Sequence, residues 1–173
     1  MHLTTLRKGM PFLLAALLGL AAATGARAEQ PVMVDIKRMS METALKIAKA
    51  TIDACRDEGV QVAVTVLDRG GHAQAVLRDV LAPDLTLTIS RQKAYTAMSF
   101  ASATSEMEDR FPTPNGVGKV DNLVFSAGGV PVTAGGTLLG GVGVSGAPSG
   151  ETDEMCAQAG IEAVSADLEM AAF

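Results

Sequence analysis

Two apolar segments separated by a pair of glycines restrict the fold of this chain more than any other feature. The segment VQVAVTVLD (60–68) carries valine at every second position from its start, which predicts a β-strand with one buried face. RGG (69–71) predicts a tight turn, and HAQAVLRD (72–79) predicts the returning strand. Strands joined this closely are antiparallel, because parallel neighbours need a crossover of about a dozen residues. The fold must therefore contain an antiparallel sheet.

Apolar side chains at three- and four-residue spacing predict helices on both sides of this hairpin. The first helix spans 41–58, with Ser40 as its N-cap and Gly59 at its end. The remaining helices are predicted over 85–100, 104–111 and 149–170, and the remaining strands over 123–126, 130–133 and 137–145. This order predicts an α+β domain in which helices pack on an antiparallel five-stranded sheet.

The first 28 residues are typical of a cleaved secretory signal peptide. Arg7 and Lys8 precede an uncharged apolar stretch (10–23), and ARA (26–28) places small residues where a signal peptidase cuts. The apolar stretch is shorter than the roughly 20 residues that a membrane-spanning helix needs. We therefore expect a periplasmic or secreted protein that begins at Glu29.

The 145 residues that follow the leader fit one domain, 29–173. They carry 11 basic and 19 acidic side chains, a formal charge of −8. Such a surface repels nucleic acid and anionic lipid, so we expect neither as a partner. No second long apolar stretch follows the leader, which predicts no membrane attachment after cleavage.

The two cysteines, Cys55 and Cys156, each lie in a predicted helix among apolar neighbours. An oxidising compartment would permit a disulfide between them. A buried free thiol also behaves as a small hydrophobic side chain, and the sequence favours this second interpretation. Structural zinc needs about four ligands, whereas residues 29–173 offer two cysteines and one histidine, so no zinc site is expected.

The glycine-rich segment GGVGVSG (140–146) contains the G-x-G-x-x-G spacing of dinucleotide-binding loops. Those loops follow a strand and open a helix of a βαβ unit, whereas here a predicted strand passes through the glycines. The acidic side chains of Glu151, Asp153 and Glu154 at the start of the next helix would also repel a phosphate. We interpret the glycines as space for another backbone or for a flat ligand.

A resemblance to a known family rests on four segments: VTVLDRGGHAQAVLRD (64–79), SRQKAYTAMSF (90–100), ATSEMEDRF (103–111) and SAGGVPVTAGGTLLGGVGVSGAPSGETDEMCAQAG (126–160). They resemble the GlcG/HbpS family of haem-binding proteins, which is similar to the C-terminal domain of PduO-type corrinoid adenosyltransferases. The resemblance covers essentially all of residues 29–173. It implies a profilin-like domain that forms homo-oligomers and binds haem, and for an exported member it implies sequestering, shuttling or sensing of haem.

Five residues could then contact a haem. His72, the one histidine after the leader, is the expected metal ligand, and a surface turn residue is the alternative. Tyr95, the single tyrosine, could ligate ferric iron or be a half-buried core residue. Arg91 and Lys93 on the same predicted helix could meet the haem propionates. Thr104 matches a stretch that looks close to the iron in haem-binding relatives, although it also suits a helix cap.

Enzyme function has weaker support. The chain lacks a nucleophile elbow, an H-E-x-x-H motif and a phosphate loop, and without C-x-x-C-H it cannot attach haem covalently. Acidic neighbours disfavour Cys156 as a thiolate ligand. Asp68 and Asp153 could be paired catalytic carboxylates, although caps of a turn and of a helix are favoured. The open alternatives are a small-molecule enzyme or accessory protein of glycolate or diol utilisation, and a corrinoid-binding or purely structural oligomer.

Overall fold

The structure is a computed structural model that describes residues 30–111 and 116–172. The predicted signal peptide (1–28) lies outside the described residues. The chain divides after Asp35 into two units, and the described part of the first, residues 30–35, contains no helix or strand. All the elements that follow belong to the second unit, which begins at Ile36.

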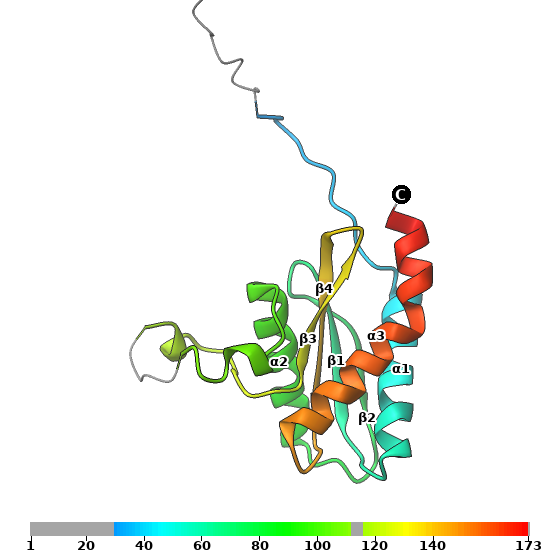
Figure 1. Ribbon diagram of the computed structural model, residues 1–173, viewed down its shortest axis with the longest axis vertical. Coiled ribbons are helices and arrows are strands. Elements are labelled where there is room, and N and C mark those ends of the chain that lie inside the picture. Colours follow the sequence, from blue (N-terminus) through cyan, green and yellow to red (C-terminus); the bar gives the residue numbers. More distant parts are fainter. Residues whose placement is uncertain (1–29, 112–115, 173) are drawn as a thin grey trace, which may run out of the picture. The chain divides into compact units, whose positions relative to one another are not determined.

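One antiparallel sheet forms the centre of this unit (Figure 1). Its four strands are β1 (Ala63–Asp68), β2 (Ala73–Arg78), β3 (Gly129–Ala134) and β4 (Thr137–Ser145), in the spatial order β2-β1-β4-β3. The predicted α+β class and the antiparallel sheet are confirmed, but the sheet has four strands and not five.

The segment 123–126, predicted as the fifth strand, does not join the sheet. Its apolar sequence suits a strand, yet a side chain takes up one of its backbone donors. The N–H of Val124 donates to Oγ1 of Thr96 at 2.9 Å, and the N–H of the nearby Ala127 donates to Oε1 of Glu108 at 2.6 Å. Because these donors are satisfied without a neighbouring strand, the segment remains a loop.

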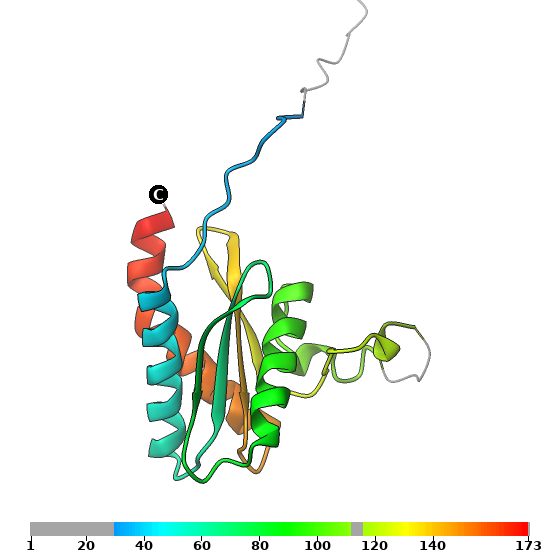
Figure 2. The same ribbon diagram turned by 180° about the vertical axis from the view of Figure 1, so that it is seen from behind.

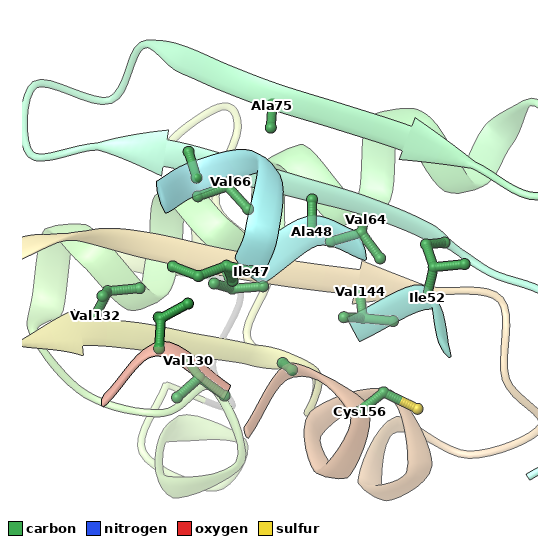
Figure 3. Close-up of a cluster of buried hydrophobic side chains, with 14 of the residues drawn as sticks. Ile47, Ala48, Ile52, Val64, Val66, Ala75, Val130, Val132, Val144 and Cys156 are labelled. Atoms are coloured by element: carbon green, nitrogen blue, oxygen red, sulfur yellow. The ribbon is translucent and has the colours of Figure 1, made fainter. Parts of the chain in front are cut away.

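Helices α1 (Met41–Asp57) and α3 (Gly150–Ala172) cover one face of the sheet (Figure 1). The expected N-cap of α1 is confirmed, since Oγ of Ser40 accepts from the N–H of Thr43 at 3.1 Å. Valines from β1, β3 and β4 gather around Ile47 of α1 on this face (Figure 3). This cluster is the main hydrophobic core.

A disulfide joins Cys55 in α1 to Cys156 in α3, with the Cα atoms 5.4 Å apart and both residues fully buried. The sequence favoured free thiols, and that prediction is wrong. The helices cross closely here because Gly160 has no side chain: a Cβ on it would lie 1.9 Å from Oγ1 of Thr51. The cysteines are separated by 101 residues, so the crossing that pairs them leaves no local pattern in the sequence.

Helix α2 (Leu85–Phe100) covers the opposite face of the sheet (Figure 2). On this face β4 presents glycines. A Cβ on Gly143 would lie 2.0 Å from the carbonyl oxygen of Ser90, and a Cβ on Gly141 would lie 2.6 Å from that of Ala94. Side chains do not fit at such distances, so the glycine-rich segment provides space for the backbone of α2. Of the two interpretations of this segment, close approach of another backbone is therefore correct.

The chain between α2 and β3 forms 3-10 turns in place of the helix predicted over 104–111. The 3-10 helices are Ser105–Met107 and Gly116–Lys119, and the second lies away from the sheet in both views (Figures 1 and 2). The rings of Phe100, Phe111 and Phe125 pack together in this region, with centroids 4.9–5.7 Å apart. None of the helices in the described part of the chain is long and apolar enough to cross a bilayer.

A candidate ligand-binding groove beside α2

A groove of about 340 Å³ opens on the α2 face of the sheet, toward strand β2. It exists because α2 lies against the glycines of β4 and leaves the edge strand β2 largely uncovered, so that Val76 is 47 % exposed. Its size lies within the range of about 300–1,000 Å³ that small-molecule pockets occupy. The lining includes Val76, Leu87, Thr88, Arg91, Gln92 and Asn122.

Arg91 and Tyr95 lie one helical turn apart on α2. Arg91 is exposed, and its guanidinium group has no hydrogen-bond or ion-pair partner within residues 30–111 and 116–172. Tyr95 is 37 % exposed, and its ring lies against the β1–β2 turn: a Cβ on Gly71 would lie 2.8 Å from Cε2 of the ring. The tyrosine therefore brings this side of α2 next to the turn that carries His72.

The turn is held by Asp68, at the end of β1. Oδ1 of Asp68 accepts from the N–H of Gly70 at 2.8 Å and from the N–H of His72 at 3.0 Å, and it lies 3.2 Å from Nδ1 of the His72 ring. Nη1 of Arg38 donates to Oδ2 at 3.3 Å. The carboxylate is buried, whereas the His72 side chain is 75 % exposed. The interpretation of Asp68 as the cap of the hairpin turn is confirmed.

The electrostatics of Asp68 follow from this arrangement. Burial by itself would raise the pKa of the carboxyl group, but the hydrogen bonds from the backbone of His72 and Gly70, with the His72 ring, outweigh it. The pKa of Asp68 is therefore lowered, and the buried group remains an anion that accepts hydrogen bonds at neutral pH.

Lys93, although on the same helix, belongs to a separate buried network at the start of α3. Its Nζ lies 2.9 Å from Oδ2 of Asp153, and the two side chains are 5 % and 4 % exposed. Oδ1 of Asp153 accepts from the N–H of Ala147 at 3.0 Å. Asp153 therefore pairs with a lysine and does not cap α3, since Oγ of Ser149 accepts from the N–H of Thr152 at 3.2 Å.

Thr104 lies in the same region and is fully buried. Its Oγ1 accepts from the N–H of Gly129 at 2.8 Å, and its own N–H donates to the carbonyl oxygen of Gly129 at 2.9 Å. Glu154 adds to the network, because its Oε2 accepts from the N–H of Ser105 at 3.2 Å and of Gly128 at 3.1 Å. The acidic start of α3 thus binds the chain on both sides of the long loop.

The structure places the five predicted site residues in two groups. Arg91 lines the groove, whereas Tyr95 lies one helical turn further along α2 against Gly71, and His72 is the next residue of that turn; neither Tyr95 nor His72 is part of the groove lining. Lys93 and Thr104 lie in the buried network and do not line the groove.

The carboxylates considered for catalysis are also apart. Asp68 pairs across the sheet with Gly140, whereas Asp153 contacts Ala147 beyond the other end of β4. The structure therefore does not form the catalytic pair. Nor do the described residues contain a group of three or more His, Cys, Asp or Glu side chains able to hold a metal ion.

The apolar walls of the groove were missed at the sequence level. Val76 occupies the exposed face of a strand, and Leu87 lies on a helix without a strongly apolar side. The available signal was the helical spacing of Leu87, Thr88, Arg91 and Tyr95, which places them along one side of α2.

These features define a class of small α+β domains in which two helices cover one face of an antiparallel sheet and a third lies against glycines on the other. A family model described as haem degrading protein HbpS-like matches residues 39–162. The chain belongs to this HbpS-like family, and the resemblance stated from the sequence is confirmed.

Individual relatives agree with the chain in sequence, and the solved structures among them agree in fold. The crystal structure of a double mutant of Streptomyces reticuli HbpS is 35 % identical, covers 82 % of this chain and 97 % of that chain, and has a TM-score of 0.73. The PduOC:heme complex is 27 % identical, with coverage of 73 % and 95 % and a TM-score of 0.68. An uncharacterized 15.0 kDa protein in the dhaT-dhaS intergenic region of Citrobacter freundii is 30 % identical over 135 residues, 75 % of this chain and 94 % of the relative.

Proposed function

We propose that this protein is exported, binds haem without a covalent link, and sequesters, shuttles or senses it. The observation that carries the proposal is the groove, whose lining combines the apolar side chains of Val76 and Leu87 with the exposed guanidinium of Arg91. Membership in the HbpS-like family supports it, as does the likeness to PduOC, which was solved as a haem complex.

The residues of the groove fit the chemistry of haem, which combines a flat apolar ring with two anionic propionates. Val76 and Leu87 would contact the ring, and the unpaired guanidinium of Arg91 would bind a propionate. His72 or Tyr95 would provide an axial ligand. Bound haem supplies an iron centre that takes such ligands and changes oxidation state.

Export is proposed from two features of the chain. Residues 1–28 are typical of a signal peptide, and the Cys55–Cys156 disulfide suits an oxidising compartment. Mass spectrometry of the protein from the periplasmic or culture fraction tests this proposal. A mature N-terminus at Glu29 is expected, and an intact leader on the native protein would contradict it.

Association of several copies is proposed from exposed apolar side chains next to the groove. Val80 and Leu81, in the loop after β2, and Leu85, the first residue of α2, are 79 %, 76 % and 66 % exposed. Apolar surface gathered in this way is typical of interaction sites. Size-exclusion chromatography with light scattering should give a multiple of the protomer mass, whereas a monomer at micromolar concentration would contradict the proposal.

A haemin titration followed at the Soret band tests haem binding directly. We expect a saturable, red-shifted band, which is lost or shifted in His72→Ala or Tyr95→Phe according to which side chain binds the iron. Lys46→Gln provides a control, since this exposed residue lies on α1, across the sheet from the groove. No band beyond that of an unrelated protein would overturn the proposal.

The family description also brings haem degradation into consideration. The titrated protein can be incubated aerobically with ascorbate, which supplies the electrons that oxidative ring opening requires. Loss of the Soret band faster than for free haemin would add degradation to the function. A stable band under the same conditions would favour storage, transfer or sensing.

A further inference from the structure

The imidazole of His72 is exposed, yet its orientation is fixed by two neighbours. The ring lies on the backbone of Gly70, where a Cβ would come within 2.8 Å of Nδ1 and 2.9 Å of Cε1. Nδ1 also lies 3.2 Å from Oδ1 of Asp68, whose carboxylate is buried beneath the turn. The turn therefore holds in place a ring that is 75 % exposed.

We propose that Asp68 is a positioning residue, which accepts a hydrogen bond from Nδ1–H of His72 and leaves the lone pair of Nε2 free to ligate iron. The proposal rests on the proposed function and selects His72 over Tyr95 as the protein ligand. In metal sites a carboxylate on the second ring nitrogen commonly fixes both the tautomer and the orientation of a ligating histidine. Within the described ranges, Nε2 has no partner of its own.

Arg38 contributes to the same arrangement from outside the hairpin. Its guanidinium binds Oδ2 of Asp68, so that Oδ1 is the oxygen that faces the turn. Oδ1 then serves both the backbone N–H groups of the turn and the ring of His72. A test must therefore separate the positioning of the ring from the stability of the hairpin.

The tautomer can be measured without haem. In mildly alkaline solution, where imidazole side chains are neutral, ¹⁵N NMR of the ligand-free chain should show His72 protonated at Nδ1. The resonance is assigned by its loss in His72→Ala. A ring protonated mainly at Nε2 would overturn the inference and leave haem binding itself untouched.

The second test compares two aspartate substitutions by haemin titration. Asp68→Asn should weaken ferric haem affinity by about 10- to 100-fold and change the axial-ligand signature in electron paramagnetic resonance. Asp79→Asn is the matched control, because it removes a buried, ion-paired carboxylate at the far end of β2 and should leave both readouts unchanged. In a His72→Ala background, Asp68→Asn should have no further effect.

Gly70→Ala tests the same idea without removing any hydrogen-bonding group. The added methyl group would displace the ring of His72, so haem affinity should fall while the thermal midpoint of unfolding changes little. The positioning role would be overturned if His72→Ala lost haem binding while Asp68→Asn and Gly70→Ala bound haem as tightly as the wild type. Absence of any haem binding would instead overturn the proposed function.

Discussion

The ammonium group of Lys93 lies 2.9 Å from Oδ2 of Asp153, and this buried ion pair joins the middle of α2 to the first turn of α3. The two helices lie on opposite faces of the sheet (Figures 1 and 2). The pair lies against Gly128, just before β3: a Cβ on this glycine would lie 2.6 Å from Nζ of Lys93. It therefore holds the layers of the domain together at one end of the sheet.

Removal of one partner of this pair should be strongly destabilising. Lys93→Met leaves the carboxylate of Asp153 buried without its cation, and we expect a loss of about 3–5 kcal/mol in the free energy of unfolding. Urea denaturation measures the loss. Lys49→Met is the control, because its pair with Asp53 is exposed and should contribute less than about 1 kcal/mol. Equal effects of the two substitutions would contradict a structural role for the buried pair.

The disulfide should provide a large part of the stability of the domain. Replacement of Cys55 and Cys156 by serine opens a loop of about a hundred residues, and we expect a loss of about 2–5 kcal/mol. Urea unfolding of the wild type with and without reductant measures the same quantity. Thiol titration of the denatured, unreduced protein should find no free thiol, and two per chain would show that the bond does not form.

The close approach of α2 makes Gly143 intolerant of any side chain. Gly143→Ala would place a methyl group 2.0 Å from the carbonyl oxygen of Ser90, so α2 must move or the chain must unfold. Gly136→Ala is the control, since a Cβ there meets nothing within 4 Å and only the positive φ of 73° costs energy, about 1–2 kcal/mol. Near-ultraviolet circular dichroism should show loss of native packing in Gly143→Ala alone. Similar thermal midpoints of unfolding for the two variants would be inconsistent with the close packing of α2 on β4.

The ion pair of Asp79 with Arg56 gives stability a defined dependence on pH. The hydrogen bond from the Arg56 guanidinium, Nε to Oδ2 at 2.8 Å, lowers the pKa of Asp79 despite the burial of the carboxylate. The contribution is therefore complete above the pKa of an unfolded aspartate, near 3.9, and is lost as the pH falls through the lower pKa of the folded state. The difference in unfolding free energy between wild type and Asp79→Asn should be constant above about pH 5 and decrease below about pH 4. A difference independent of pH would exclude this linkage.

Arg91 should contribute modestly to haem affinity, because its contact with a propionate is exposed to solvent. Its guanidinium is exposed, so Arg91→Gln should weaken haemin binding by about two- to fivefold, and added salt should reduce the difference. Lys46→Gln, which removes the same charge on the other face of the sheet, should bind haemin as the wild type does. An equal loss in both variants would mean that overall charge, not the groove, attracts the ligand.

The parts of the fold that could be predicted from the sequence are those fixed by local pattern. Alternating valines identified β1, and capping and spacing identified α1 from Ser40 to the glycine after it. The strand over 137–145 was predicted with the bounds that β4 has. The strand predicted over 123–126 is wrong: the N–H of Val124 binds the side chain of Thr96, and the N–H of Ala127, just beyond the segment, binds Glu108. These partners come from distant parts of the sequence.

The candidate site was less accessible to sequence reasoning, because it depends on which side of α2 each residue takes. Arg91 and Lys93 are two positions apart on one helix, and only the packing of α2 on the glycines decides that the first is exposed and the second is buried. The Cys55–Cys156 bond depends in the same way on the crossing of two helices.

The first elements of the chain pack partly against elements that are synthesised last. β1 pairs with β4, and α1 is bonded through its cysteine to α3, the final helix. A ribosome must therefore release almost the entire polypeptide before the valine-rich core can close. Until then β1 and α1 can pack only against β2 and each other, so the core stays open to solvent until β3, β4 and α3 have been made.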